Sequence, residues 1–126
     1  MSQFVETNTK SFRAGGAIGQ YLRVKLTAGL LALAGIADRE IGTMESSSFA
    51  SGEPKAVRLR TACGTIKMVA NGAITQGANV FTAASGKISA TAGSTSYLIG
   101  QALEAAGADG DVIEVLRNSH GDTATP

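Results

Sequence analysis

Only one pair of side chains in this sequence could act as a nucleophile with its base, and the two lie far apart. Cys63 is the single cysteine and His120 the single histidine. A cysteine nucleophile needs an imidazole that orients and deprotonates it, but His120 lies in the polar stretch NSHGDTATP, and such chain ends are commonly poorly ordered. We therefore expect Cys63 to be a small buried apolar residue and the protein not to be an enzyme.

Paired carboxylates are the next groups that could do chemistry. Asp38 and Glu40 flank a predicted loop, and Asp109 and Asp111 lie on either side of Gly110 in GADGD. The second pair lacks the further oxygen ligands that a calcium loop supplies, and one cysteine can build neither an internal disulfide nor a metal cluster. We expect no metal site and no cofactor.

Gly15, Gly16 and Gly19 in RAGGAIGQ have a spacing that superficially resembles a phosphate-binding loop. Such a loop needs a following helix whose N-terminus faces the anion, whereas a strand pattern follows here. The Walker lysine with its serine or threonine is also missing after these glycines. The sequence therefore predicts no phosphate site.

Charge and hydropathy bear on the class of partner. Lys and Arg number 11 against 10 acidic residues, for a net charge of +1, so the overall charge attracts neither nucleic acid nor an anionic membrane. The stretch LTAGLLALAGIA is too short and too interrupted by glycine to cross a bilayer. We expect a soluble protein made in a reducing cytoplasm, with no membrane partner and no direct nucleic-acid partner.

The elements that position all these residues are predicted to be strands. Apolar and charged residues alternate in YLRVKLT, AVRLRTA, GTIKMVA and DVIEVLR, as in strands with one buried and one exposed face. In the first of these, Arg23 and Lys25 are expected to face solvent. SYLIGQALEAAGA could form a helix or a strand, and Gly100 in its middle favours the strand. Short clusters of Gly, Ser, Asn and Asp between the strands are typical of turns.

A repeat organises these strands. Gly-Ala-Ile-x-Gln occurs at Gly16–Gln20 and again at Gly72–Gln76, and similar patterns follow both copies in the same order. We interpret this as duplication of a four-strand unit of about 56 residues; chance matching in a chain rich in Gly and Ala is the alternative. In each copy the glycine should permit a tight turn and the isoleucine should lie at the barrel wall.

The sequence thus predicts an all-β fold of short strands, either a small β-barrel or a β-sandwich. At 126 residues the chain is long enough for one domain. We expect a polar N-terminal arm over residues 1–15, a β-barrel domain over residues 16–117 and a flexible C-terminal tail over residues 118–126.

The second half resembles a known family. GAITQGANVFTAASGKISATAGSTSYLIGQALEAAGADGDVIEVLRN is similar to the recurring C-terminal pattern of the small capsid cement or head decoration proteins of tailed bacteriophages. The shared features are an I-x-x-G-x-x-V turn and strand, an x-G-K-I hairpin, an I-G-x-A-L-E-A strand, a Gly/Asp loop and a final V-I-E-V-L. The resemblance covers Gly72–Arg117 well and Ala17–Ala62 loosely, and it does not extend to residues 1–15 or beyond Asn118.

This resemblance implies a structural virion protein. Members of the family bind the outside of an assembled shell of major capsid protein, commonly as homotrimers at three-fold or quasi-three-fold positions, and stabilise it against the pressure of packaged DNA. The expected location is the outer capsid surface of the virion, after synthesis in the bacterial host cytoplasm. The family has no catalytic residues that could be carried over to this sequence.

Two segments are candidates for contact with the capsid or a neighbouring subunit. The N-terminal arm carries Phe4, Val5 and Phe12 as apolar anchors and Arg13 for an acidic partner; a frayed terminus is the alternative. The segment MESSSFASGEPKA presents Phe49 among small polar residues, with a solvated loop as the alternative.

Two other classes of function remain open from the sequence. The chain could be another β-rich virion module of a tail, fibre or baseplate. It could also be a small carbohydrate-binding or β-clip domain, although Tyr21, Tyr97 and four phenylalanines are a small supply of aromatic side chains for a sugar site.

Overall fold

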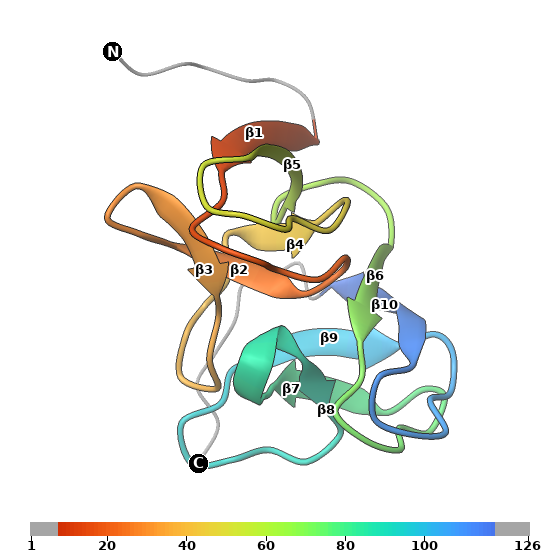
Figure 1. Ribbon diagram of the computed structural model, residues 1–126. Coiled ribbons are helices and arrows are strands. Elements are labelled where there is room, and N and C mark those ends of the chain that lie inside the picture. The colour runs from red at the N-terminus through yellow and green to blue at the C-terminus, as the bar shows by residue number, and fades with distance from the viewer. Residues whose placement is uncertain (1–7, 118–126) are drawn as a thin grey trace.

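The computed structural model describes residues 8–117, which form two open antiparallel sheets of five short strands each (Figure 1). The first sheet has the order β1-β5-β4-β2-β3, and the second has the order β6-β10-β9-β7-β8. The strands are β1 (Thr9–Arg13), β2 (Arg23–Thr27), β3 (Leu30–Leu33), β4 (Gly42–Met44), β5 (Pro54–Leu59), β6 (Ile66–Val69), β7 (Asn79–Thr82), β8 (Ile88–Ser89), β9 (Leu98–Ala102) and β10 (Val112–Arg117), with the 3-10 turn η1 (Ala84–Gly86) after β7.

The all-β expectation is confirmed, and of its two alternatives the structure agrees with the sandwich of short strands. Over residues 8–117 neither sheet closes into a barrel. Each sheet instead curls until one isolated parallel bridge, Ala14 with Leu31 in the first and Ala70 with Ile88 in the second, links the region of its two edge strands. The expected strand around Gly100 is also confirmed, as β9.

The two halves have the same topology, as the expected duplication requires, but each unit has five strands and not four. The additional strand is β1, which corresponds to β6 and pairs with β5 as β6 pairs with β10. Its sequence, TKSFR, lacks an alternating apolar pattern and therefore gave no strand signal. Residues 9–13 of the expected arm thus belong to the first sheet, and residues 1–7 lie outside the described residues.

The repeated glutamine makes the same contact in both halves. The side-chain Nε2 of Gln20 donates to the carbonyl oxygen of Glu45 at 2.9 Å, and Nε2 of Gln76 donates to that of Leu103 at 3.1 Å. Each glutamine thereby ties the turn before the second strand of its unit to the chain that leaves the fourth strand. The motif therefore repeats because one structural turn is used twice.

The glycines of the motif, by contrast, are not required by the backbone. Gly16 and Gly72 have no positive φ, and a Cβ at either would meet nothing within 4 Å. The tightest backbone approaches are instead at Gly42 and Gly100, where a Cβ would overlap a carbonyl oxygen of the facing strand, β5 or β10. The close approach of two backbones, and not a tight turn, is the reason for glycine at these equivalent positions.

Each half has its own apolar core. In the first, five buried residues form the cluster: Ile18, Val24, Leu31, Met44 and Val57. The larger cluster of the second contains Ile66, Met68, Ala70, Ile74, Val80, Ile88, Ile99, Ala102, Ala106, Ile113 and Val115. The isoleucines of the repeated motif, Ile18 and Ile74, are buried in these cores and do not form the wall of a barrel. Because the cores are separate, the orientation of the halves depends on the contacts at their junction.

Arg23 lies at this junction, and the expectation that it faces solvent is wrong. It is fully buried, whereas Leu26 on the same strand is 44% exposed. Its guanidinium reaches the second half, where Nε donates to the Lys87 carbonyl at 3.0 Å and Nη2 donates to the Ala83 carbonyl at 2.6 Å. The second half therefore covers the face of β2 that the alternating pattern assigned to water.

Glu40 neutralises the buried charge at the junction. Its Oε1 lies 3.4 Å from Arg23 Nη1, and its Oε2 lies 2.6 Å from Arg117 Nη2 at the end of β10. Burial has the largest effect on the pKa of Arg23 and lowers it, whereas the negative charge of Glu40 acts to raise that pKa. Burial alone would raise the pKa of Glu40, but the charges of Arg117 and Arg23 hold that pKa below its ordinary value of 4.5. Two arginines from different halves thus share one carboxylate.

The shared carboxylate predicts acid sensitivity. Because the folded pKa of Glu40 is lowered, its contribution is fully present above pH 4.5 and is lost as the pH falls through the folded pKa. Glu40→Gln should lower the free energy of unfolding at neutral pH by about 3–5 kcal/mol, because two buried guanidinium groups lose their partner. Urea unfolding from pH 7 to pH 3 measures both effects.

The matched control is Asp109→Asn, which breaks a surface pair with Lys87 in which the Asp109 side chain is 61% exposed. It should change the free energy of unfolding by only about 0–1 kcal/mol. The role given to Glu40 would be contradicted if the Glu40→Gln variant were as stable as this control and its free energy of unfolding fell between pH 7 and pH 3 as that of the unmodified protein does.

The close backbone approach at Gly100 gives a second prediction. Gly100→Ala should destabilise the protein by about 1–3 kcal/mol, since strands β9 and β10 must move apart to admit the methyl group. Gly72→Ala, the control in open space, should change stability by less than about 0.5 kcal/mol. Thermal unfolding of both variants tests this, and equal melting temperatures would refute the explanation.

Candidate contact surface

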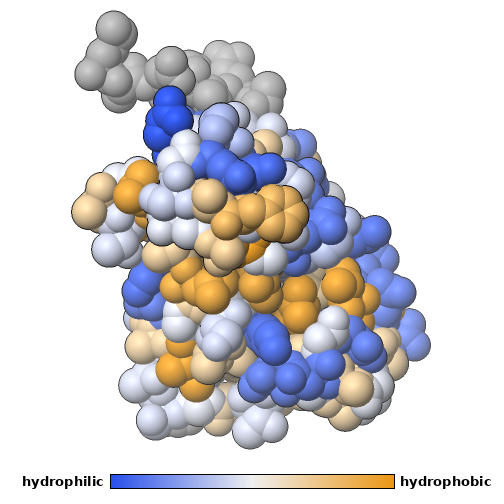
Figure 2. All heavy atoms as spheres, viewed as in Figure 1, coloured by the Kyte–Doolittle hydropathy of each residue, from blue (hydrophilic) through white to orange (hydrophobic). Residues whose placement is uncertain are grey.

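Exposed apolar side chains gather on the first half of the molecule. Among the described residues, the large exposed ones are Leu26, Leu30, Leu33, Ile36 and Phe49 in the first half, and Val112 and Leu116 in the second. Figure 2 shows apolar side chains on the projecting β2–β3 hairpin and in a band across the middle of the face in view. Concentrated exposed apolar surface of this kind marks a site of protein contact.

The β2–β3 hairpin owes its shape to a two-residue turn. Ala28 and Gly29 both have positive φ, 52° and 83°, as the type I′ turn of a tight hairpin requires. Strand β3, with the sequence LLAL, is apolar on both faces, so that Leu31 is buried while Leu30 and Leu33 are 36% and 37% exposed. The sequence contained this signal, an apolar run without alternation, but our expected contact residues did not include the hairpin.

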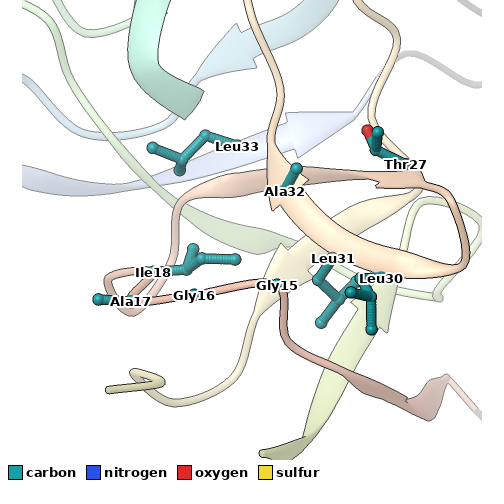
Figure 3. Close-up of a pocket in the computed structure, with 9 residues that line it drawn as sticks. All are labelled: Gly15, Gly16, Ala17, Ile18, Thr27, Leu30, Leu31, Ala32 and Leu33. Atoms are coloured by element: carbon teal, nitrogen blue, oxygen red, sulfur yellow. The ribbon is translucent and has the colours of Figure 1, made fainter. Parts of the chain in front are cut away.

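A groove of about 350 Å³ lies between this hairpin and the chain that follows β1 (Figure 3). Residues 15–18 line one side, and Thr27 with residues 30–33 line the other. The Gly15 N–H donates to the Leu31 carbonyl at 2.8 Å, and a Cβ at Gly15 would come within 2.7 Å of that oxygen. Gly15 therefore lets the two walls of the groove meet at its base, and its N–H is engaged within the chain.

Phe49 is 78% exposed and lies in the loop that is hydrogen-bonded to one wall of this groove. Ser48, the preceding residue, holds the groove wall through Oγ, which donates to the Gly16 carbonyl at 2.7 Å, and exchanges backbone hydrogen bonds with Ile18. The N–H of Phe49 donates to Oε1 of Glu53 at 2.9 Å. The loop that carries Phe49 is thus fixed by side-chain hydrogen bonds, and the aromatic ring is presented to solvent.

The structure places the other expected contact residues differently. Arg13 is exposed, and its Nη1 donates to the Gly52 carbonyl at 2.8 Å, so Arg13 and Phe49 border the same loop. Phe12 is half-buried against the first core, with the Lys10 ammonium 5.6 Å from its ring centroid. Phe12 therefore anchors β1 internally. Phe4 and Val5 lie outside the described residues.

The groups considered for chemistry are separated or already engaged. Cys63 is exposed, so the expectation of a buried cysteine is wrong; it lies in the connection between the two sheets, which neither core covers. His120 lies outside the described residues. Asp38 pairs with Lys25 at 2.8 Å, and that hydrogen bond is the main reason why the pKa of Asp38 is lowered. Within residues 8–117 no three His, Cys, Asp or Glu side chains are grouped as metal ligands.

A second, polar cleft of about 460 Å³ lies between the halves. Tyr21 and Lys67 both line it, and the Lys67 ammonium lies 5.7 Å from the centroid of the Tyr21 ring. The aromatic ring in this cleft is thus already in a cation–π contact within the chain.

For the part of the chain that the structure covers, no helix is both long enough and apolar enough to span a membrane.

Comparison with known proteins agrees with the architecture. The structure is similar to the head fiber gp8.5 N base of bacteriophage phi29, with a TM-score of 0.72 and 18% sequence identity, over 87% of this chain and 92% of that one. At this identity the likeness concerns the fold alone. No protein with curated function matches the sequence.

The sequence itself assigns the family. The family model described as phage cement protein matches residues 6–117, which include every strand of both sheets. This match covers the first half as fully as the second, whereas the resemblance noted from the sequence was loose there. Together with the fold, it makes this chain a structural protein of a phage virion. The chain belongs to the phage cement protein family.

Proposed function

We propose that this protein binds the outer surface of an assembled phage capsid and stabilises the lattice of major capsid protein. The observation that carries the proposal is the contact surface of the first half, where Phe49 and the groove beside it leave apolar side chains exposed. Membership of the cement family supports it. On this proposal the protein acts by contact alone and not as an enzyme.

The proposed state on the capsid is a homotrimer at three-fold or quasi-three-fold positions. This state comes from the family resemblance. A stable contact needs roughly 800 Å² from each partner, which one loop does not provide, so we propose that the exposed hairpin, the groove and the Phe49 loop contribute together. The proposed location is the outer surface of the virion capsid, after synthesis in the host cytoplasm.

Co-sedimentation with heads tests the proposed function. Purified protein is mixed with expanded, decoration-free heads of the source phage, with unexpanded shells and with isolated tails. Saturable binding to expanded heads and a higher temperature of head disruption are expected. Binding to tails alone would instead favour a tail, fibre or baseplate module. Binding to none of these particles, with hits on a glycan array, would favour the carbohydrate-binding alternative.

Phe49 gives the sharpest point mutation. Phe49→Ser should weaken head binding by about 2 kcal/mol, roughly 30-fold in Kd, if the exposed ring is an anchor of the interface. The melting temperature should not fall, because the ring packs against neither core. The control is Leu116→Ser, a 46% exposed apolar residue of the second half, which should bind normally. Equal affinities of the two variants for heads would argue against the Phe49 contact.

The N-terminal arm is tested by a deletion that leaves the sheets complete. Removal of residues 1–7 takes away Phe4 and Val5 but keeps β1, whereas a deletion through Arg13 would also remove that strand. We expect lower occupancy on heads at equal protein concentration, with an unchanged melting temperature. Removal of residues 119–126 serves as the control. Unchanged occupancy and oligomeric state after the first deletion would exclude a binding role for the arm.

A further inference from the structure

The junction within the chain shows how one repeat recognises another. The β7–β8 hairpin of the second half lies against the segment between β3 and β4 of the first half (Figure 1). The Gly86 N–H at its turn donates to the Ala34 carbonyl at 2.8 Å, and Thr82 Oγ1 donates to the Ile36 carbonyl at 2.6 Å. A hairpin of one repeat is thus bound by the backbone of a short turn in the other.

The first half contains a similar hairpin, with a loop that is one residue shorter: four residues separate Leu26 from Leu31, and five separate Thr82 from Ile88. Ser85 and Gly86 have φ of 60° and 75° at the turn of the second half, and the equivalent Ala28 and Gly29 have 52° and 83° in the first. The strand registers also agree: Leu26 opposite Leu31 in the first hairpin corresponds to Thr82 opposite Ile88 in the second. Leu26 and Gly29 therefore occupy the positions of Thr82 and Gly86, the two residues that make the junction contacts.

The second half likewise contains the same receiving turn. In the first half, the Gly35 N–H donates to Oδ2 of Asp38 at 2.8 Å, and the Asp38 N–H returns to the Gly35 carbonyl at 3.3 Å. In the second half, Gly93 and Ser96 make the same pair of bonds at 2.9 Å and 3.3 Å. The turn at residues 92–96 is thus the counterpart of residues 34–38, with Ser94 at the position of Ile36.

Burial distinguishes the used elements from their copies. At the junction, three residues are buried: Thr82, Gly86 and Ala34. Their counterparts are exposed and are, in the same order, Leu26, Gly29 and Ala92. The chain therefore uses one hairpin and one receiving turn internally. Of the second pair, the β2–β3 hairpin tip is exposed, and so are Ala92, Ser94 and Thr95 of the turn. Gly93 of that turn lies close to the Ile36 side chain, and Ser96 is buried.

The backbone part of the interface is thus present twice, because the Gly29 N–H and the Ala92 carbonyl copy the Gly86 N–H and the Ala34 carbonyl. The hydrogen bond of Thr82 Oγ1 has no copy, since Leu26 has no hydroxyl, and an apolar side chain takes its place.

We propose that the β2–β3 hairpin of one molecule docks on the turn at residues 92–96 of a second copy of this chain. The contact is head-to-tail, so it repeats from molecule to molecule and closes a ring if the rotation allows. It supplies the contact between copies that the proposed homotrimer needs; it therefore rests on the proposed self-association but not on capsid binding.

The composition of the two segments suits this contact. Residues 26–30 (LTAGL) and residues 90–96 (ATAGSTS) contain no charged side chain, so their approach meets no like-charge repulsion and requires no desolvation of a charge. Asn79 takes the place of Arg23 beside the second receiving turn and is exposed. The contact between copies therefore lacks the buried guanidinium of the internal junction and is the weaker and more reversible of the two.

Directed disulfide formation tests this contact. In a Cys63→Ser background, one chain carries Leu26→Cys and another carries Ser94→Cys, positions equivalent to the Thr82–Ile36 contact. The two chains are mixed, oxidised and analysed by non-reducing electrophoresis, free in solution and bound to heads. We expect covalent dimers in the mixture, only background dimer from either chain alone, and higher covalent oligomers from a chain that carries both cysteines.

The control mixture pairs Leu26→Cys with Thr75→Cys, an exposed position on a different loop of the second half, and should give only background dimer. Circular dichroism shows that each variant is folded. Dimer formation by the control, or by Leu26→Cys alone, overturns the head-to-tail contact, as does the absence of mixed dimers both in concentrated solution and on heads. Head binding of the unmodified protein is measured separately. A failure of the proposed function therefore appears as absent head binding, whereas a failure of the head-to-tail contact appears as absent mixed dimers.

Discussion

The burial of Arg23 between the two halves is the constraint on which the arrangement of this molecule depends. A guanidinium without water must have all its charge and hydrogen bonds compensated inside the protein. Glu40 supplies the opposite charge, and the carbonyl oxygens of Ala83 and Lys87 in the second half accept hydrogen bonds from the Arg23 guanidinium. Since Arg117 binds the same carboxylate, each half contributes an arginine, and the two sheets are held in one orientation although their apolar cores do not merge.

Duplication accounts for the architecture, and the differences between the copies account for the exposed surface. Both units have the same strand order and the same glutamine contact. They diverge where the chain meets itself: the second hairpin is covered by the first half, whereas the tip of the first hairpin is exposed among residues 8–117. A repeat that joins its neighbour through one asymmetric interface necessarily leaves one unused side at each end. On the proposed function, those ends and the adjoining groove are the surface for assembly.

The sequence by itself determined the local features of this protein. The period-two patterns predicted most of the strands, the Gly-Ala-Ile-x-Gln motif identified the repeat, and Gly100 favoured a strand in an ambiguous segment. Such features depend on neighbouring residues and on the alternation of side chains along one strand. Family assignment was also accessible, because the motifs of the second half are contiguous in the sequence. Of the contact surface, only the exposed Phe49 and Arg13 were anticipated.

Only the tertiary structure decided what covers each strand face. The alternation in YLRVKLT placed Arg23 in water, but the second half lies over it; Cys63 was expected inside, but neither core reaches it. Strand β1 had no pattern of its own and exists because β5 offers an edge. The exposed leucines of the hairpin were visible in the sequence as an apolar run, but such a run does not tell a covered strand from an exposed one. Periodicity reports which residues share a face, whereas burial depends on the segment, distant in sequence, that packs against that face.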